Sequence, residues 1–142
     1  LIVMGIILYI VDKKAPNKTE YKDMTFKQTF IIGISQALAF IPGVSRSGIT
    51  MTTGRLMGVD RASTAKYSFM LSAPIVLGAT LYKFKDFVFG IPFVVGVLSS
   101  FIVGLLVIKF LLQYLQKGSF KVFAIYRIVV GLAVIALFVA RM

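Results

Sequence analysis

The pattern of apolar and polar positions divides the chain into five apolar units separated by short polar segments. A membrane-spanning helix needs roughly 20 apolar residues. The last two units exceed this length, whereas the third is short and is expected to borrow residues from its polar flank or to lie tilted. We predict the end of a transmembrane helix at 1–11, a cytoplasmic loop at 12–28, a broken unit at 29–58, and transmembrane helices at 65–82, 87–112 and 120–140.

The first apolar unit, LIVMGIILYIV, is already apolar at residue 1. A signal peptide would show a basic start and a small-residue cleavage site, and neither is visible. We therefore interpret residues 1–11 as the tail of a membrane helix that begins upstream. On this interpretation the 142 residues form a single membrane domain that belongs to a larger protein.

The unit at 29–58 contains one proline and several glycines, which is too much punctuation for one uninterrupted helix. Pro42 lacks an N–H donor and disfavours a helical conformation at Ile41, so the first half-helix is expected to end there. Gly43 allows the chain to turn. Ser45 or Ser47 can then cap a second half-helix. The pattern predicts a helix–loop–helix hairpin.

The positions of the basic residues favour a hairpin that enters and leaves the membrane on one side. In that arrangement eleven Lys and Arg residues lie on one side and three on the other, and the excess predicts that the first side is cytoplasmic. A full crossing at 29–58 would place the lysines of 12–28 opposite the basic residues after the hairpin. The larger group is Lys13, Lys14, Lys18, Lys22, Lys27, Arg55, Arg61, Lys66, Lys109, Lys117 and Lys121, and the smaller is Lys83, Lys85 and Arg141.

Composition supports a membrane protein. The chain is 58% hydrophobic with a mean hydropathy of +0.93, well above the apolar share of a soluble domain. Its formal net charge of +11 would suggest nucleic acid in a soluble protein, but here the basic residues flank apolar runs and suit anionic lipid headgroups. The sequence contains no cysteine and no histidine, which excludes thiolate metal sites and removes the commonest general base.

The turn IPGVSRSGIT carries the candidate chemistry. The N-terminus of the second half-helix presents free N–H groups and a positive dipole end, and Arg46 adds a planar fork of donors. Ser45, Ser47 and Thr50 add hydroxyl groups, so the pattern predicts an anion site that suits phosphate. The alternative is that Arg46 reaches the headgroups or pairs with a carboxylate, while the serines and glycines only pack helices.

Two further polar residues lie within apolar units. Gln36 either contributes to the same cavity as Arg46 or holds helices together, and the sequence favours neither. Arg127 is a weaker candidate, because an arginine near a membrane end commonly extends to the interface. Asp60 and Arg61 are interpreted as solvated loop residues.

The segment GISQALAFIPGVSRSGIT resembles a signature of the undecaprenyl-diphosphate phosphatases of the bacitracin-resistance type, G-x-x-Q-x-x-A-x-x-P-G-x-S-R-S-G-x-T. The FMLSAP run and the two long apolar spans that follow are also similar to the C-terminal half of these enzymes. The resemblance therefore covers nearly the whole chain. The matching positions are Gly33, Gln36, Ala39, Pro42, Gly43, Ser45, Arg46, Ser47, Gly48 and Thr50.

The resemblance implies an all-α integral membrane enzyme of the bacterial cytoplasmic membrane, built from two inverted-topology repeats that each carry a re-entrant helix–loop–helix. Such enzymes convert undecaprenyl diphosphate to undecaprenyl phosphate and inorganic phosphate, which recycles the lipid carrier for cell-wall synthesis and confers bacitracin resistance. The implied partners are the polyprenyl diphosphate substrate and the bilayer. A homodimer is a further expectation. The implied catalytic residues are Ser45, Arg46 and Ser47, and the implied substrate contacts are Gln36, Gly43, Gly48 and Thr50.

The chain departs from the family because it lacks a first repeat. Its acids fall in loops or at span ends, so the glutamates that the resemblance implies have no counterpart here. A divalent cation, Mg or Ca, is expected to be held by the missing N-terminal half, and the fragment alone is expected to be inactive. A transporter or lipid-carrier translocator that binds an anionic headgroup, or a structural membrane subunit, remains an alternative. The acids are Asp12, Glu20, Asp23, Asp60 and Asp86.

Overall fold

The computed structural model describes residues 1–87 and 89–141. Apart from an isolated bridge between Thr19 and Val59, the regular elements of these residues are helical, as the sequence predicted. Three short 3-10 segments, η1 (Tyr21–Asp23), η2 (Gln36–Phe40) and η3 (Phe84–Asp86), join the longer helices. The α-helices are α1 (Ile2–Lys14), α2 (Phe26–Ser35), α3 (Arg46–Leu56), α4 (Arg61–Tyr82), α5 (Ile91–Lys117) and α6 (Lys121–Val139).

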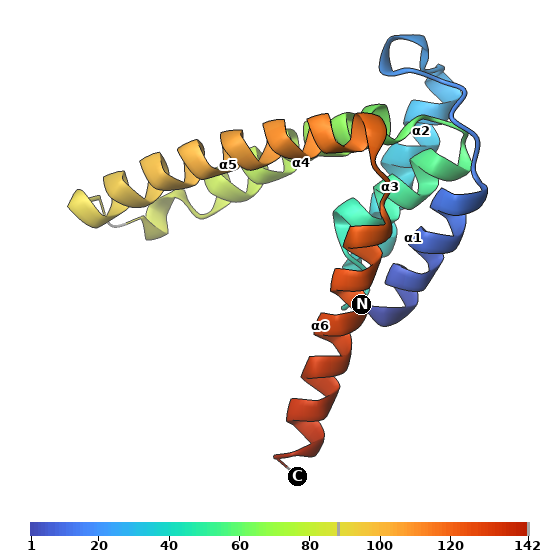
Figure 1. Cartoon of the computed structure of the whole chain (residues 1–142). Coiled ribbons are helices and arrows are strands. Elements are labelled where there is room, and N and C mark those ends of the chain that lie inside the picture. Colours follow the sequence, from blue (N-terminus) through green and yellow to red (C-terminus); the bar gives the residue numbers. More distant parts are fainter. Residues whose placement is uncertain (88, 142) are drawn as a thin grey trace.

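The helices form a body and an arm (Figure 1). In the body, α1 packs against α6 and α3, and α3 also packs against α2 and α4. The arm consists of α4 and α5, which lie side by side and extend sideways from the body. A small apolar core joins the two parts at the base of the arm. Its buried members are Leu8, Met51, Ala65, Leu115 and Phe120.

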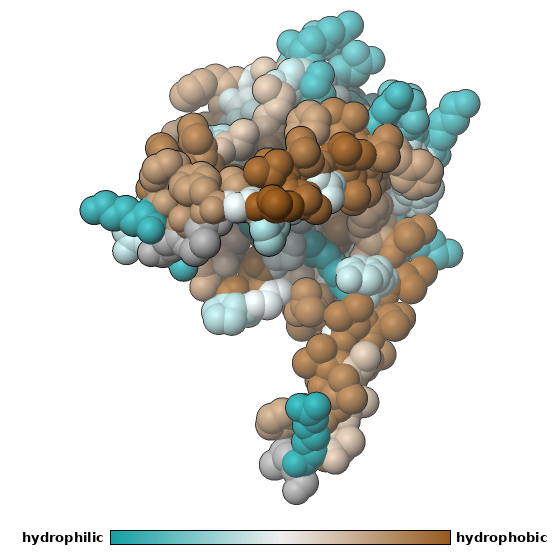
Figure 2. Space-filling view, turned by 90° about the vertical axis from the view of Figure 1, so that its left-hand side faces the viewer, coloured by the Kyte–Doolittle hydropathy of each residue, from teal (hydrophilic) through white to brown (hydrophobic). Residues whose placement is uncertain are grey.

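The surface of the outer helices is apolar. Among the described residues, α5 and α6 are long and apolar enough to cross a membrane, each with a mean hydropathy of 2.6 over its best window. Almost none of these side chains is buried inside the protein, and Figure 2 shows hydrophobic residues covering the end of the arm and the descending α6. The predicted span 65–82 lies within α4, which is not among the helices that are long and apolar enough to cross a membrane. That this segment crosses the membrane stays a prediction.

Residues 29–58 form a helical hairpin whose two ends lie together. Thr25 caps α2 in a reciprocal pair with Gln28, as expected for a capping box. The Gln28 amide also donates to the carbonyl of Met57 at 3.0 Å, beyond the far end of α3. The backbone N–H of Lys18 donates to the carbonyl of Gly58 at 3.0 Å. The chain therefore enters and leaves the hairpin beside the same loop.

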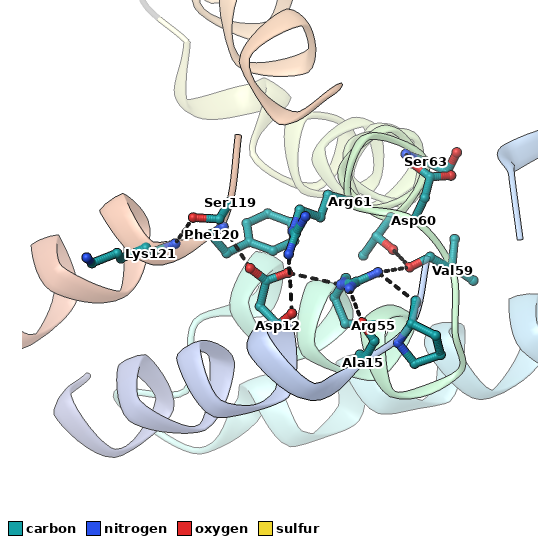
Figure 3. A network of polar contacts seen from close by, with 12 residues as sticks. Asp12, Ala15, Arg55, Val59, Asp60, Arg61, Ser63, Ser119, Phe120 and Lys121 are labelled. Carbon is teal, nitrogen blue, oxygen red and sulfur yellow. Dashed lines mark hydrogen bonds and ion pairs between the residues drawn. The ribbon is translucent and has the colours of Figure 1, made fainter. Parts of the chain in front are cut away.

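A buried ion network fastens four helix ends at this side of the molecule (Figure 3). Asp12, at the end of α1, is 4% exposed, and its Oδ1 accepts from Arg55 Nε at 3.0 Å and Arg61 Nε at 2.7 Å. Its Oδ2 accepts from the backbone N–H of Phe120, which precedes α6, at 3.1 Å. One carboxylate thus joins α1, α3, α4 and α6.

The guanidinium of Arg55 is satisfied on every side. Arg55 is fully buried, and besides Asp12 it donates to the carbonyls of Ala15 at 2.7 Å, Pro16 at 3.2 Å and Val59 at 2.6 Å. A buried charge is tolerated when it is both paired and hydrogen-bonded. Arg55 therefore serves the architecture of this end of the molecule.

The interpretation of Asp60 and Arg61 as solvated loop residues is wrong. Asp60 caps α4 by accepting from the backbone N–H of Ser63 at 3.0 Å. Arg61 lies in the first turn of α4 and pairs with Asp12. The reason is that the loop between α3 and α4 is short, so both residues are held against the ends of neighbouring helices.

Candidate functional site

The break in the hairpin follows the sequence prediction. The 3-10 segment η2 ends at Phe40, Ile41 is extended, and Gly43 turns the chain with a φ of +87°. A positive φ is readily adopted only by glycine, which explains the residue at that position. Ser45 then caps α3, because its side chain accepts from the backbone N–H of Gly48 at 3.4 Å. This decides between the two serines proposed as caps.

Arg46 and Gln36 line one cavity of about 540 Å³. Arg46 Nη1 and Gln36 Oε1 are both buried, and neither has a hydrogen-bond partner among the described residues. Leaving such groups buried without partners costs free energy, so a ligand beside these two residues that accepts from Arg46 and donates to Gln36 would be stabilised. The rest of the lining is Gly33, Ile34, Ala37, Ala39, Phe40 and Ile75, which is almost wholly apolar.

The two serines lie together beside the start of α3. The hydroxyl oxygens of Ser45 and Ser47 are 3.2 Å apart. Ser45 Oγ also accepts from Arg127 Nη2 at 2.7 Å. The sequence favours an interfacial role for Arg127, but the structure brings its guanidinium to the turn. The only signal in the sequence was a charged residue within an apolar span.

Thr50 lies one turn further into α3 and faces α4. It is 1% exposed, its hydroxyl donates to the backbone carbonyl of Arg46 or Ser47, and its oxygen lies 2.7 Å from the hydroxyl of Ser68. These contacts tie α3 to α4. The structure does not bring the Thr50 hydroxyl to the cavity of Arg46, and its assignment as a substrate contact stays a prediction.

The described residues do not by themselves provide a metal site. They contain no group of three or more Asp, Glu, His or Cys side chains able to hold a metal ion. The carboxylate of Asp12 is buried but is engaged by two guanidiniums and a backbone N–H, and none of its hydrogen-bond partners comes from the turn. The residues described here therefore do not hold the divalent cation that the resemblance implies.

The fold and the site together define a class of protein. It is a helical protein with two helices of membrane-spanning length, in which a broken hairpin presents a guanidinium and hydroxyl groups at the N-terminus of a half-helix. Such an arrangement of unpaired donors is suited to bind an anion.

Comparison with known proteins gives the family. The family described as "Bacitracin resistance protein BacA" matches residues 1–133, and the chain belongs to this family. The chain is 51% identical over 144 residues to the undecaprenyl-diphosphatase of Pelotomaculum thermopropionicum, covering 99% of this chain and 54% of that protein. It is 46% identical to the undecaprenyl-diphosphatase of Desulforudis audaxviator, over 99% of this chain and 55% of that protein.

A third relative, the undecaprenyl-diphosphatase of Moorella thermoacetica, is 45% identical over 144 residues, with 99% of this chain and 55% of that protein covered. The chain thus spans about half the length of the curated relatives it matches. Membership of this family accounts for the resemblance in the segment around Arg46.

Proposed function

We propose that this chain forms the C-terminal half of a membrane phosphatase that hydrolyses undecaprenyl diphosphate to undecaprenyl phosphate and inorganic phosphate. The observation that carries the proposal is Arg46 at the start of α3, which lines a cavity and whose buried Nη1 has no hydrogen-bond partner among the described residues. The names of the relatives support the substrate, and the apolar remainder of the lining is compatible with a lipid. Hydrolysis would recycle the lipid carrier of cell-wall synthesis and give bacitracin resistance.

In this proposal Arg46 stabilises negative charge on the phosphoryl oxygens. Phosphoryl transfer passes through a largely dissociative transition state, and catalysis relies mainly on positioning and electrostatic stabilisation. The N-terminus of α3 and the hydroxyls of Ser45 and Ser47 would add donors to the same group. Gln36 would contact the substrate in the cavity that it shares with Arg46, and Gly43 would allow close approach of the backbone. Gly48 would act on the site through the room that it leaves for Arg127.

The remaining chemistry is assigned to the other half of the protein. A general base or a carboxylate that holds a divalent cation is needed, together with a nucleophile, either serine or water. Because the described residues lack such a carboxylate cluster, we place these groups in an N-terminal repeat related by inverted topology. A homodimer in the bacterial cytoplasmic membrane is part of the proposal, and chemical crosslinking in membranes tests it.

Expressed alone, residues 1–142 are expected to release no phosphate from undecaprenyl diphosphate above background, because the carboxylates lie elsewhere. The measurement is phosphate release by membranes that contain the segment, compared with membranes that contain the full-length protein. Turnover by the segment that depends on Arg46 would show that the assigned carboxylates are not required.

We also propose that 29–58 is re-entrant, so that α2 and α3 enter the membrane and return to the cytoplasmic side. The hydrogen bonds that join both ends of the hairpin to the same loop support this topology. In the present structure the arm runs across the direction of α6 (Figure 1). If α5 and α6 both cross one flat bilayer, the arm must turn about its base. The small core at that base is compatible with such a movement.

Single cysteines test the topology, because the segment has no cysteine of its own. Lys18→Cys and Lys117→Cys are expected to react with a membrane-impermeant thiol reagent from the cytoplasmic side, and Lys85→Cys from the outer side. All three lysines are exposed. If 29–58 crossed the membrane fully, Lys18→Cys and Lys117→Cys would react from opposite sides, which would contradict the re-entrant hairpin.

A second candidate function has one feature in its favour. Broken half-helices that meet within the membrane also form the substrate sites of secondary transporters. On that alternative Arg46 would bind an anionic solute or a lipid headgroup without cleaving it. Release of inorganic phosphate from undecaprenyl diphosphate by the purified full-length protein separates the two functions.

A further inference from the structure

Arg127 reaches the turn from a different helix. It lies in α6, yet its Nη2 donates to Ser45 Oγ, the cap of α3, at 2.7 Å. The two residues are 82 positions apart in the sequence. The contact joins the start of the broken half-helix to a helix that is otherwise packed on α1. Arg127 is thus placed at the anion site by tertiary packing.

The guanidinium of Arg127 retains donor capacity. Its Nη1 is buried and has no hydrogen-bond partner among the described residues, and the same holds for Nη1 of Arg46. Neither arginine takes part in the ion pairs of the described residues, which involve Lys22, Arg55 and Arg61. Arg127 contacts Ser45 from α6, and Arg46 follows Ser45 in the chain, so two guanidiniums that lack a carboxylate partner among the described residues belong to residues around the start of α3. An anion with more than one charged group satisfies this arrangement.

Gly48 makes the close approach of Arg127 achievable. A Cβ atom at this position would overlap the guanidinium, with Nη2 at 2.6 Å and Cζ at 2.7 Å. Contacts below about 3 Å to a new methyl group are not tolerated, so any larger residue would displace Arg127. Glycine at position 48 therefore leaves the room that the Arg127 side chain from α6 occupies.

The contacts of Ser45 fix the direction of its own proton. Ser45 Oγ accepts from Arg127 Nη2 and from the backbone N–H of Gly48. A hydroxyl has two acceptor lone pairs, so both are used and the O–H group is left to donate. It can donate to Ser47, 3.2 Å away, or to a bound anion. Arg127 therefore converts Ser45 into an oriented donor.

We propose that Arg127 is a second guanidinium of the substrate site, which orients Ser45 and contacts a diphosphate group together with Arg46. A ligand with two phosphate groups engages both Arg46 from α3 and Arg127 from α6. A ligand with one phosphate group engages Arg46 alone. Arg127 thereby distinguishes the diphosphate substrate from the monophosphate product. This inference rests on the proposed function and assigns its specificity.

Arg127→Gln in the full-length protein tests the inference. The KM for undecaprenyl diphosphate is expected to rise about tenfold to a hundredfold, because a hydrogen bond to a charged group is lost. The inhibition constant of undecaprenyl phosphate is expected to change about twofold or less, as for a residue that the product does not contact. Arg127→Lys should recover part of the affinity, since it keeps the charge but loses the fork. Arg141→Gln is the matched control, because Arg141 is an exposed arginine just beyond the C-terminal end of the same helix.

Gly48→Ala provides an independent route to the same loss. The added methyl group should displace Arg127 and raise the KM for the diphosphate without removing the arginine. In the Arg127→Gln background, Gly48→Ala should add little, because the overlapping guanidinium is gone, so the two effects are expected to be non-additive. Gly104→Ala on α5 is the control, because a Cβ there meets no atom within 4 Å.

The outcomes separate this inference from the proposed function. If the parent protein hydrolyses the diphosphate and Arg127→Gln changes the constants of substrate and product equally, or changes neither, Arg127 is structural and the inference is overturned. The rise in Tm that each lipid causes gives a readout without turnover. A parent protein that fails to hydrolyse the diphosphate contradicts the proposed function. In that case the inference would still be supported if the diphosphate raised the Tm more than the monophosphate did and if Arg127→Gln abolished this difference. If the two lipids raised the Tm equally, the inference would be overturned.

Discussion

Arg46→Ala in the full-length protein is expected to lower kcat/KM for undecaprenyl diphosphate by about a hundredfold to a thousandfold. The physical reason is the loss of a preorganised cationic donor aimed at a group where negative charge develops, and removal of one such donor has an effect of that size. Arg46→Lys should recover part of the rate, because it keeps the charge but not the planar pair of donors. Steady-state phosphate release in detergent or membranes measures both.

The serines give a graded comparison with Arg46. Ser45→Ala and Ser47→Ala each remove one hydroxyl, at a cost of roughly 0.5–2 kcal/mol for a lost cap or hydrogen bond. A much larger loss at one serine would identify that residue as the nucleophile. Extraction yield and Tm must match the parent protein, because loss of a cap can unfold α3. Arg46→Ala that is folded, inserted and active at the parent rate would refute the assignment of the phosphate site.

Asp12→Asn is expected to destabilise the protein by about 3–5 kcal/mol, the usual cost of removing one partner from a buried ion pair. Arg55 is fully buried and would lose its counterion, and Arg61 would lose the same carboxylate. Asparagine keeps the size of the side chain, so the loss reports charge and hydrogen bonding. The free energy of unfolding in mixed micelles, or the Tm, is the measurement.

Glu20→Gln is the matched control for Asp12→Asn. It also neutralises one carboxylate paired with a basic residue, Lys22 at 3.5 Å, but both side chains are more than 70% exposed. Exposed pairs contribute little, so no measurable change in Tm is expected. Asp12→Asn with the stability of the parent would mean that the ends of α1, α3, α4 and α6 are held by packing alone.

Local features of the hairpin could be predicted from the sequence because their causes are local. Pro42 removes a donor and restricts Ile41, Gly43 permits a positive φ, and a serine before a helix supplies a cap. Each effect acts within a few residues, and the structure confirms the break, the turn and the cap. The signature around Arg46 also led to the family that the comparison shows.

The partners of charged residues could not be predicted, because they depend on which helix ends meet. The sequence treated Asp12 as a loop acid, and nothing near it indicated a pair with Arg55, 43 positions away. The burial of both groups follows from the packing of α1 on α3 and α6. A buried charge is stable only when its partner is present, so such a network is a property of the assembled fold.

The sequence by itself determined the helical class, two of the membrane-length segments, the broken hairpin and the guanidinium at its turn, since periodicity and residue type are enough for these. Only the tertiary structure decided that Arg127 reaches Ser45, that Gly48 makes room for it, and that Thr50 binds Ser68. These contacts join residues on different helices, and their existence depends on distances between helices that no local pattern encodes. The physical reason is that hydrogen bonds require atoms within about 3 Å, which only packing can bring about.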